Sequence, residues 1–198
     1  MVVAAHRRSQ LFQAEARRQP HARDADWTAS YGGEKPVEWL TNQTIDTLRF
    51  RHAAYLIAVS YGLVDDDSYT GIVKRMETLN ANNRQKREAG QVIYGRSEYD
   101  IASYIDYEMT ALKNDYVDDA TKPGMNPSET EVQEYYDAHD WTVDGVEGKA
   151  PLADVKANVK TALRTERYRE RAQSKADKID VSTLPWKRLY AYAATLIG

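Results

Sequence analysis

Apolar side chains recur along most of this chain at the spacing of an α-helix, and this periodicity restricts the fold more than any other feature. They step by three and four residues over 45–59, and again over 69–79 and 101–116. The predicted core residues of the last helix step by four with a single step of five: Val155, Val159, Leu163, Tyr168, Ala172 and Ala176. Such steps place side chains on one face of a helix. Only the run "QVIY" at 91–94 has the character of a strand. We therefore predict an all-α fold: an irregular multi-helix domain with a long C-terminal helix over 152–179.

Local signals mark where these helices begin and end. Pro36 suits the first turn of a helix, and Gly62 can take the left-handed conformation that ends one. The run "DDDSY" offers an N-cap for the second helix, and Ser128 with Glu131 forms a capping box for a later one. The apolar face of the first helix is predicted to consist of Ile45, Leu48, His52, Tyr55 and Val59.

The C-terminal segment differs from the rest of the chain. Residues 1–183 are predicted to form a single helical domain, and residues 184–198 an aromatic tail. The apolar residues of the tail fall on roughly one face of a short helix: Trp186, Leu189, Tyr190, Ala193, Leu196 and Ile197. Because monomeric proteins rarely leave such a face in water, we expect the tail to dock on its own domain or on a second copy, forming a homodimer.

Charge and hydropathy exclude several classes of partner. With 27 basic and 30 acidic residues the net charge is −3, so the chain has no overall attraction for nucleic acid or an anionic membrane. The Arg-rich segment 1–23, in which Glu15 is the single acid, is interpreted as a solvent-exposed helix, with a nucleic-acid arm as the alternative. No stretch reaches the roughly 18 apolar residues of a membrane span. We therefore expect no nucleic acid partner and no membrane span.

Sequence patterns for catalysis and metal binding are missing. The chain has no cysteine, and its four histidines lack the spacing of a metal site. Gly-rich phosphate loops and the GxSxG nucleophile elbow are also absent from the sequence. We predict no catalytic residues, no metal site and no cofactor.

The stretch "GQVIYG", residues 90–95, interrupts the helical pattern. Gly90 is expected to end one helix, and Gly95 permits the turn toward the next. Val92, Ile93 and Tyr94 are predicted to fill the core between the two helices. The stretch is therefore interpreted first as a structural corner, and a contact of Tyr94 with peptide is the secondary interpretation.

Four blocks, in order along nearly the whole chain, resemble the helical chaperone module of the SurA/PrsA foldases: "GLVDDDSYTGIVKRMETLNANNR", "VIYGRSEYDIASYIDYEMTALKND", "NPSETEVQEYYDAHD" and "PLADVKANVKTALRTERYRERAQSKADKIDV". They are most similar to SurA-N-like bacterial proteins of lipoprotein type with an "N-x-x-R … YG-x-x-x-Y … Y" pattern. That pattern is matched by Asn80 or Asn83, Arg84 or Arg87, Tyr94, Gly95, Tyr99 and Tyr104. A further helix motif of this family is matched by Ser128, Glu131, Val132, Tyr135 and Tyr136.

The chain departs from these foldases at two points. In them a parvulin-type prolyl isomerase domain precedes the long final helix, whereas the loop 140–151 fills that place in this chain. This loop is far shorter than the roughly 50 residues of a small domain, so no prolyl isomerase activity is implied. The family is typically exported, and a leader and a "VNG"-like strand are not found in this sequence. We expect a cytoplasmic protein if Met1 is the native start, and an extracytoplasmic one if a leader was removed.

The resemblance implies a non-catalytic chaperone that holds unfolded or extended polypeptide in an aromatic-lined groove. Tyrosine and tryptophan suit such a groove, since their rings contact apolar side chains and their polar tips contact backbone groups. A rival hypothesis is an enzyme or biosynthetic accessory protein that reuses the scaffold around a peptide or small-molecule pocket, and a third is a structural dimer built on the tail. The residues predicted to line the groove are Trp39, Tyr55, Tyr94, Tyr104, Tyr107 and Tyr136.

Overall fold

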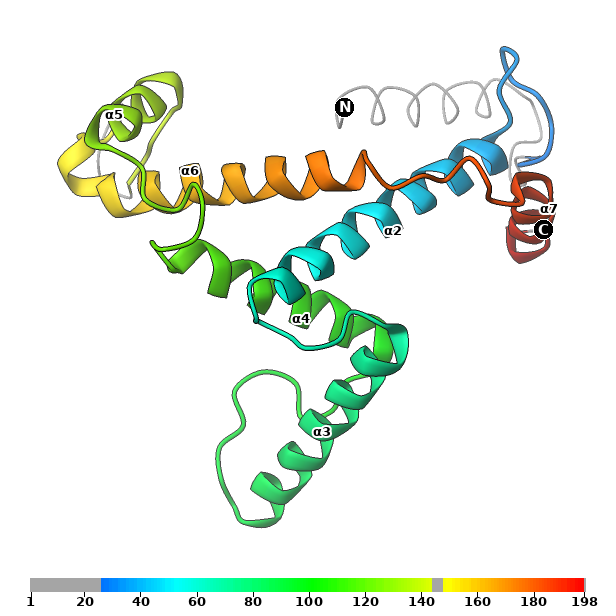
Figure 1. Ribbon diagram of the computed structural model, residues 1–198, viewed down its shortest axis with the longest axis horizontal. Coiled ribbons are helices and arrows are strands. Elements are labelled where there is room, and N and C mark those ends of the chain that lie inside the picture. The colour runs from blue at the N-terminus through cyan, green and yellow to red at the C-terminus, as the bar shows by residue number, and fades with distance from the viewer. Residues whose placement is uncertain (1–25, 144–147, 198) are drawn as a thin grey trace. The chain divides into compact units, whose positions relative to one another are not determined.

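The computed structural model describes residues 26–143 and 148–197, and this part of the chain is all-α, as predicted (Figure 1). Its helices are α2 (Pro36–Ser60), α3 (Tyr69–Glu88), α4 (Ile101–Asp118), α5 (Glu129–Ala138), α6 (Leu152–Ala176) and α7 (Trp186–Ile197). Within the described residues, the β character is limited to a single bridge between Tyr31 and Glu34. The Arg-rich segment 1–23, interpreted as a helix from the sequence, lies outside the described residues.

These residues form two compact units. One unit comprises residues 50–179, with the end of α2 and all of α3 to α6. The other comprises the described residues up to Arg49 together with those from Asp180 onward. The division into 1–183 and 184–198 that the sequence suggested stays a prediction.

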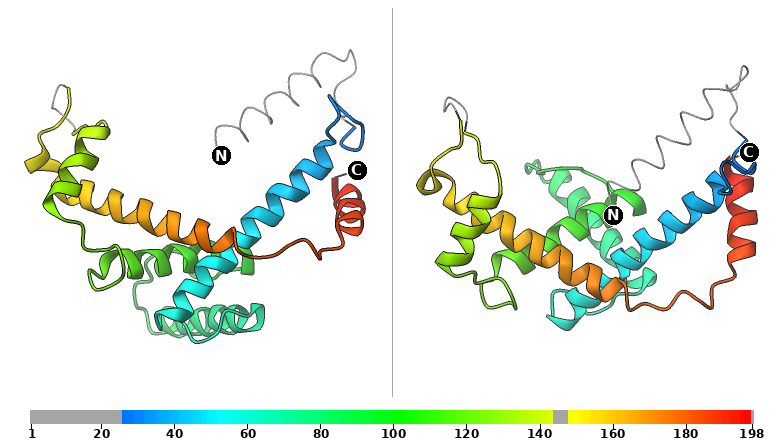
Figure 2. Two further views of the ribbon diagram at one scale, coloured as in Figure 1. Left: turned by 45° about the horizontal axis from the view of Figure 1, so that its top comes forward. Right: turned by 90° about the horizontal axis from the view of Figure 1, so that it is seen from above.

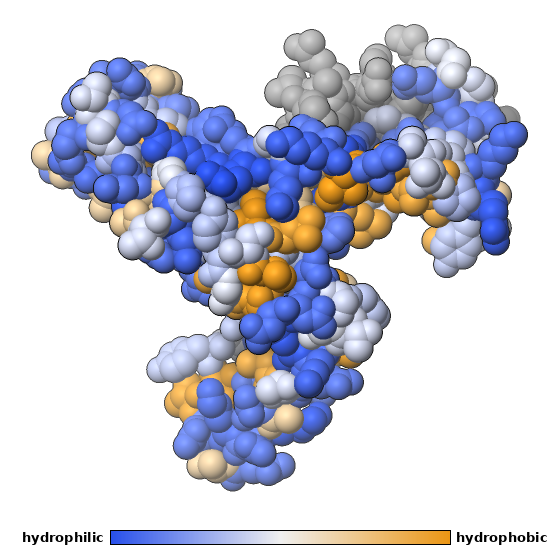
Figure 3. Space-filling view, viewed as in Figure 1, coloured by the Kyte–Doolittle hydropathy of each residue, from blue (hydrophilic) through white to orange (hydrophobic). Residues whose placement is uncertain are grey.

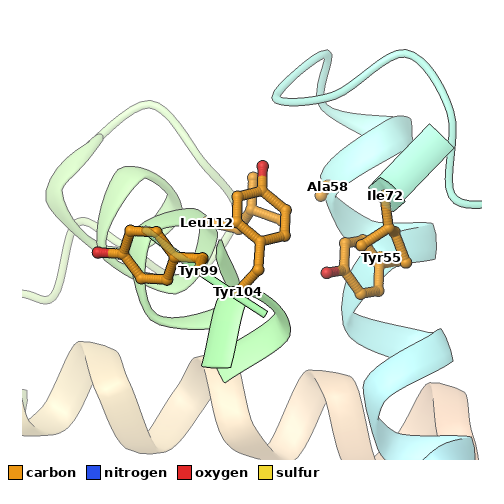
Figure 4. Close-up of a cluster of buried hydrophobic side chains, with 6 residues drawn as sticks. All are labelled: Tyr55, Ala58, Ile72, Tyr99, Tyr104 and Leu112. Carbon is orange, nitrogen blue, oxygen red and sulfur yellow. The ribbon is translucent and has the colours of Figure 1, made fainter. Parts of the chain in front are cut away.

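Within the unit 50–179, α3 packs on α4, α4 packs on α6, and α5 packs on α6. Figure 2 shows α5 beside the first turns of α6. Three clusters of buried side chains form the core. The first joins α2, α3 and α4, the second joins α2, α4 and α6, and the third joins α5 to α6. The first cluster consists of Tyr55, Ala58, Ile72, Tyr99, Tyr104 and Leu112 (Figure 4).

The helix-capping signals act as predicted. The side chain of Ser68 accepts a hydrogen bond from the Gly71 amide at 3.0 Å and caps α3. Ser128 and Glu131 form the capping box of α5. Gly62 has a φ of 68°, the left-handed conformation that favours glycine after a helix. These local interactions satisfy backbone groups that the helix itself leaves unpaired, which explains why they could be identified from sequence.

The apolar pattern predicted for the long helix is confirmed. Its six predicted core side chains are all buried: Val155, Val159, Leu163, Tyr168, Ala172 and Ala176. The helix itself ends at Ala176, three residues before the predicted end at Ile179.

The face predicted for α2 is wrong in part. Three of its predicted members, Leu48, His52 and Val59, are exposed, and the exposed fractions of Leu48 and Val59 are 50% and 37%. In the second half of α2 the buried positions are instead the consecutive run 53–58, apart from half-buried Leu56. Tyr55 belongs to the first core cluster and Ile57 to the second, so the last turns of α2 are covered on two sides. A pattern of one apolar face could not anticipate this, because small alanines at 53, 54 and 58 provide part of the contact.

The tail forms α7, and it contacts its own chain. The Tyr190 hydroxyl donates a hydrogen bond to Oδ1 of Asn42 in α2 at 3.0 Å. The ring of Trp186 lies 5.8 Å from that of Tyr190. Tyr192 and Leu196 are exposed, at 64% and 67%. Docking of the tail on a second copy stays a prediction.

Deletion of residues 184–198 is expected to lower the free energy of unfolding by about 1–3 kcal/mol, since it removes the half-buried Trp186 and Leu189 and the hydrogen bond to Asn42. Urea denaturation followed by circular dichroism measures the loss, and light scattering reports any change from dimer to monomer. Leu196→Ser is the control and should change stability by no more than about 0.5 kcal/mol. If the deletion changes neither the free energy of unfolding nor the oligomeric state, the tail is not docked.

Candidate functional site

The six residues predicted to line a groove fall into three classes of exposure. Tyr55 and Tyr104 are buried. Trp39 and Tyr136 are half-buried, and Tyr94 and Tyr107 are exposed. The structure brings Tyr55 and Tyr104 together on one carboxylate, and the Tyr107 ring lies 6.2 Å from that of Tyr104. The role of all six in peptide binding stays a prediction.

A buried carboxylate is the polar centre of the first core cluster. Glu108 of α4 has an exposed fraction of only 6%. Its Oε2 accepts a hydrogen bond from the Tyr55 hydroxyl, and its Oε1 accepts one from the Tyr104 hydroxyl, each at 2.8 Å. Tyr104 lies one helical turn before Glu108, whereas Tyr55 comes from α2. Figure 4 shows the rings of these two tyrosines on their separate helices.

Arg75 of α3 completes this arrangement. Its Nε lies 2.6 Å from Oε1 of Glu108, and its Nη2 lies 3.0 Å from Oε2. Its remaining nitrogen, Nη1, donates to the carbonyl of Asp66 at 2.7 Å. A two-point contact between guanidinium and carboxylate fixes orientation as well as distance. The Glu108 network, defined as Glu108, Arg75, Tyr55 and Tyr104, therefore ties α2, α3 and α4 together.

The hydrogen bonds of the network decide the charge of its members. Burial favours the neutral acid, but the bonds from Arg75, Tyr55 and Tyr104 outweigh it, and the pKa of Glu108 lies below its ordinary value. Burial and the bond to Glu108 raise the pKa of both tyrosines. Glu108 is thus ionised at neutral pH, and the tyrosines are neutral donors. A carboxylate with a lowered pKa and four donors is a poor proton acceptor, so the network is suited to holding helices together rather than to acid–base chemistry.

Three tyrosines lead from this network to the surface. The rings of Tyr99 and Tyr107 lie 5.0 Å apart, and each lies 6.2 Å from the ring of Tyr104. Tyr107 is 45% exposed, whereas Tyr99 and Tyr104 are buried. Packing against two buried rings restricts the rotamers of Tyr107, so its exposed edge is a preformed aromatic contact.

The loop that joins α3 to α4, residues 89–100, is anchored by two buried asparagines. Oδ1 of Asn80 accepts from the Tyr99 amide at 2.9 Å, and its Nδ2 donates to the Tyr99 carbonyl at 2.8 Å. Nδ2 of Asn83 donates to the carbonyl of Arg96 at 3.3 Å. The Asn80 amide thus pairs both backbone groups of Tyr99 as a neighbouring strand would, and holds the end of this α3–α4 loop in place.

The prediction that Val92, Ile93 and Tyr94 fill a core is wrong. Val92 is 72% exposed and Tyr94 is 93% exposed, while Ile93 is half-buried. Because the asparagines close the loop at its base, its apolar residues are not needed to hold it. Figure 3 shows hydrophobic residues on the surface of this part of the molecule, around α3. The loop tip, defined as Val92–Tyr94, therefore presents apolar and aromatic side chains to solvent on an anchored base.

Asn80→Ala is expected to lower the free energy of unfolding by about 1–3 kcal/mol, because the buried amide and carbonyl of Tyr99 lose their partner. Urea denaturation measures the loss. Asn82→Ala is the matched control: Asn82 lies two positions further along the same helix, is exposed, and should change stability by about 0.5 kcal/mol or less. Equal losses in the two variants would contradict the anchoring role of Asn80.

The described residues hold no candidate metal centre. Within them, no group of three or more His, Asp and Glu side chains is placed to bind a metal ion. None of the described helices has the length and apolar character needed to cross a membrane.

Neither Glu108 as a site residue nor its partners were identified from the sequence. The available signal was an acidic residue among the apolar residues of a helix, because a buried carboxylate needs a hydrogen-bond donor as its partner. The donor Arg75 lies 33 positions earlier in sequence, and no local spacing links the two residues.

Comparison with known proteins gives one informative relative. No family model matches the chain, and no solved structure matches it. The chain is similar to a protein of Bifidobacterium longum subsp. longum named chaperone for lacto-N-biosidase, with 51% identity over 172 residues. The match covers 87% of this chain and 61% of that protein, so the chain spans about three fifths of its relative's length. The resemblance to the SurA/PrsA foldases stays a prediction.

Proposed function

We propose that this chain is a non-catalytic chaperone for a glycosidase of the lacto-N-biosidase type, binding its client in an unfolded or extended state. The observation that carries the proposal is the 51% identity to a protein named as a chaperone for that enzyme. Because the match covers 87% of this chain, it must include most of the unit 50–179 and cannot be limited to an isolated motif.

The loop tip and Tyr107 support a binding role. Val92 and Tyr94 are apolar or aromatic side chains held in solvent, and Tyr107 is an aromatic edge packed against buried rings. Tyrosine offers a large contact area with few rotatable bonds, so it loses little entropy when it binds. The anchors Asn80 and Asn83 restrict the loop before any client arrives, which further reduces the entropic cost of association.

Suppression of aggregation tests the proposal. Lacto-N-biosidase of Bifidobacterium longum is unfolded in denaturant, diluted into buffer without nucleotide or metal, and followed by light scattering with increasing amounts of the chain. We expect scattering to fall as the chain approaches equimolar amounts, because binding of non-native client competes with self-association.

Two controls sharpen this experiment. Serum albumin at equal mass accounts for crowding, and an unrelated aggregation-prone enzyme separates a dedicated chaperone from a general one. Protection of the glycosidase at lower chain concentration than the unrelated enzyme supports the proposal. Unchanged scattering of the glycosidase at several-fold excess of the chain contradicts it.

A further inference from the structure

A basic groove lies in the unit 50–179, away from the loop tip in sequence. Its lining comes from the C-terminal end of α2, the turn at 123–124 and the second half of α6. The groove has a volume of about 680 Å³. This lies within the roughly 300–1,000 Å³ of typical ligand sites, and it is large enough for a few side chains of an extended polypeptide.

The charge of the groove is opposite to that of the whole chain. Four cations line it, Arg167, Arg171 and Lys175 of α6 and Lys178 just after its end, against one acid, Glu170. Steps of four residues place Arg167, Arg171 and Lys175 along one side of α6. The chain as a whole has a net charge of −3, so this positive stretch is a local feature and not a reflection of overall composition.

One of these cations is fixed by the protein and three are available. Arg167 forms an ion pair with Glu131, and its Nη1 donates to the Gly124 carbonyl at 3.1 Å. Arg171, Lys175 and Lys178 form no ion pair with any residue in the described part of the chain. Basic residues in the last turn of a helix can serve its dipole, but Arg171 lies more than one turn before the end of α6. The available charges therefore suit an anionic ligand.

The rest of the lining favours polypeptide over nucleic acid. Ile57, Tyr61 and Pro123 supply apolar surface beside the cations. A nucleic acid site would need an open aromatic face for base stacking. The Tyr61 ring instead packs edge-on against Tyr116 at 5.1 Å and carries the ammonium of Lys122 at 5.4 Å. The mixture of cations and apolar side chains matches a segment in which carboxylates alternate with apolar residues.

We propose that this groove binds an acidic segment of extended polypeptide, with Arg171, Lys175 and Lys178 contacting its carboxylates and Ile57 and Pro123 contacting its apolar side chains. The inference rests on the proposed function for the source of the segment, the client glycosidase. It gives the chaperone a second type of contact: the loop tip takes apolar side chains, and the basic groove selects acidic stretches.

The test uses a fluorescein-labelled peptide of alternating Glu and Leu and its Gln-for-Glu counterpart, with binding to the full chain followed by anisotropy. The chain is expected to bind the acidic peptide about tenfold more tightly than the Gln peptide, and added salt should weaken binding. The double variant Arg171→Glu with Lys175→Glu should weaken it about tenfold. The matched control, Lys74→Glu with Arg169→Glu, changes the total charge equally at exposed positions outside the groove and should retain binding.

Arg171→Gln with Lys175→Gln provides a milder variant, and circular dichroism confirms that each protein is folded. Equal binding by the groove and control variants overturns the inference, as does equal affinity for the two peptides. Tighter binding of single-stranded DNA than of the acidic peptide, lost in the same variants, also overturns it. The peptide assay contains no glycosidase, so its outcome is independent of the aggregation experiment. A failure to bind the peptide would contradict the groove inference alone, and a failure to suppress aggregation would contradict the proposed function alone.

Discussion

Glu108→Ala is expected to lower the free energy of unfolding by about 3–5 kcal/mol, a large part of the roughly 5–15 kcal/mol that stabilises a typical domain. The substitution leaves the Arg75 guanidinium without its carboxylate and two buried tyrosine hydroxyls without an acceptor. Because these groups come from α2, α3 and α4, the loss affects the packing of all three helices. Urea denaturation followed by circular dichroism measures it.

Three variants identify the origin of this loss. Glu77→Ala removes an exposed acid of α3 and should cost about 0.5 kcal/mol or less. Glu108→Gln keeps an acceptor but loses the charge, so its loss should lie between those of the two alanine variants. Arg75→Met should cost less in the Glu108→Ala background than in the original chain, by about 1–3 kcal/mol, because the pair acts as a unit. A loss below about 1 kcal/mol for Glu108→Ala would contradict the network's role.

The network also predicts the direction of a pH effect. The pKa of Glu108 is lowered in the folded state from an ordinary value of 4.5, so its contribution is fully present above that pH. The contribution is lost as pH falls through the lower folded pKa. The stability gap between the original chain and Glu108→Gln should therefore narrow in acid, which melting temperatures measured across this range would show. A gap that stays constant below pH 4.5 would contradict an ionised Glu108.

Val92→Ser combined with Tyr94→Ser is expected to weaken protection of the glycosidase by about 30-fold, while stability changes by about 0.5 kcal/mol or less. Both side chains lie in solvent, at 72% and 93% exposure, so the fold loses almost nothing when they are shortened. A central aromatic contact in an interface commonly contributes about 2 kcal/mol or more, which corresponds to this factor. The measurement is the chain concentration that halves client aggregation.

The control for this variant is Tyr69→Ser. Tyr69 is 65% exposed and lies at the start of α3, outside the loop tip, so its removal should leave protection unchanged. Asn80→Ala keeps the tip residues but loosens their anchor, and it should give an intermediate effect. If the tip variant protects the client as well as the original chain does, the loop tip is not the contact surface.

The fold class and the long helix could be predicted because they depend on local patterns. The capping box at Ser128 and the buried side chains of α6 follow from spacings within a few turns of one helix. The buried side of α2 depends on helices far away in sequence, and there the simple pattern of one apolar face fails at Leu48 and Val59. Periodicity identifies a helix more reliably than it identifies the neighbours that cover it.

The loop tip was misassigned for a related physical reason. Three consecutive apolar or aromatic residues between two helices suggested a buried corner, because burial is the common fate of such residues. The loop is closed instead by polar side chains of α3, Asn80 and Asn83. Asn80 and Tyr99 are 19 positions apart, and hydrogen bonds over this distance produce no periodic pattern in the sequence. The exposure of Tyr94 could therefore be recognised only from the structure.

The measurement that tests the central claim most directly is the recovery of glycosidase activity. Denatured lacto-N-biosidase of Bifidobacterium longum is diluted with the chain, with the loop-tip variant, or with albumin, and hydrolysis of its substrate is assayed after refolding. A chaperone function predicts several-fold more active enzyme with the original chain than with albumin, and a clear loss of this gain with the loop-tip variant. Equal activity in all three samples would contradict the account.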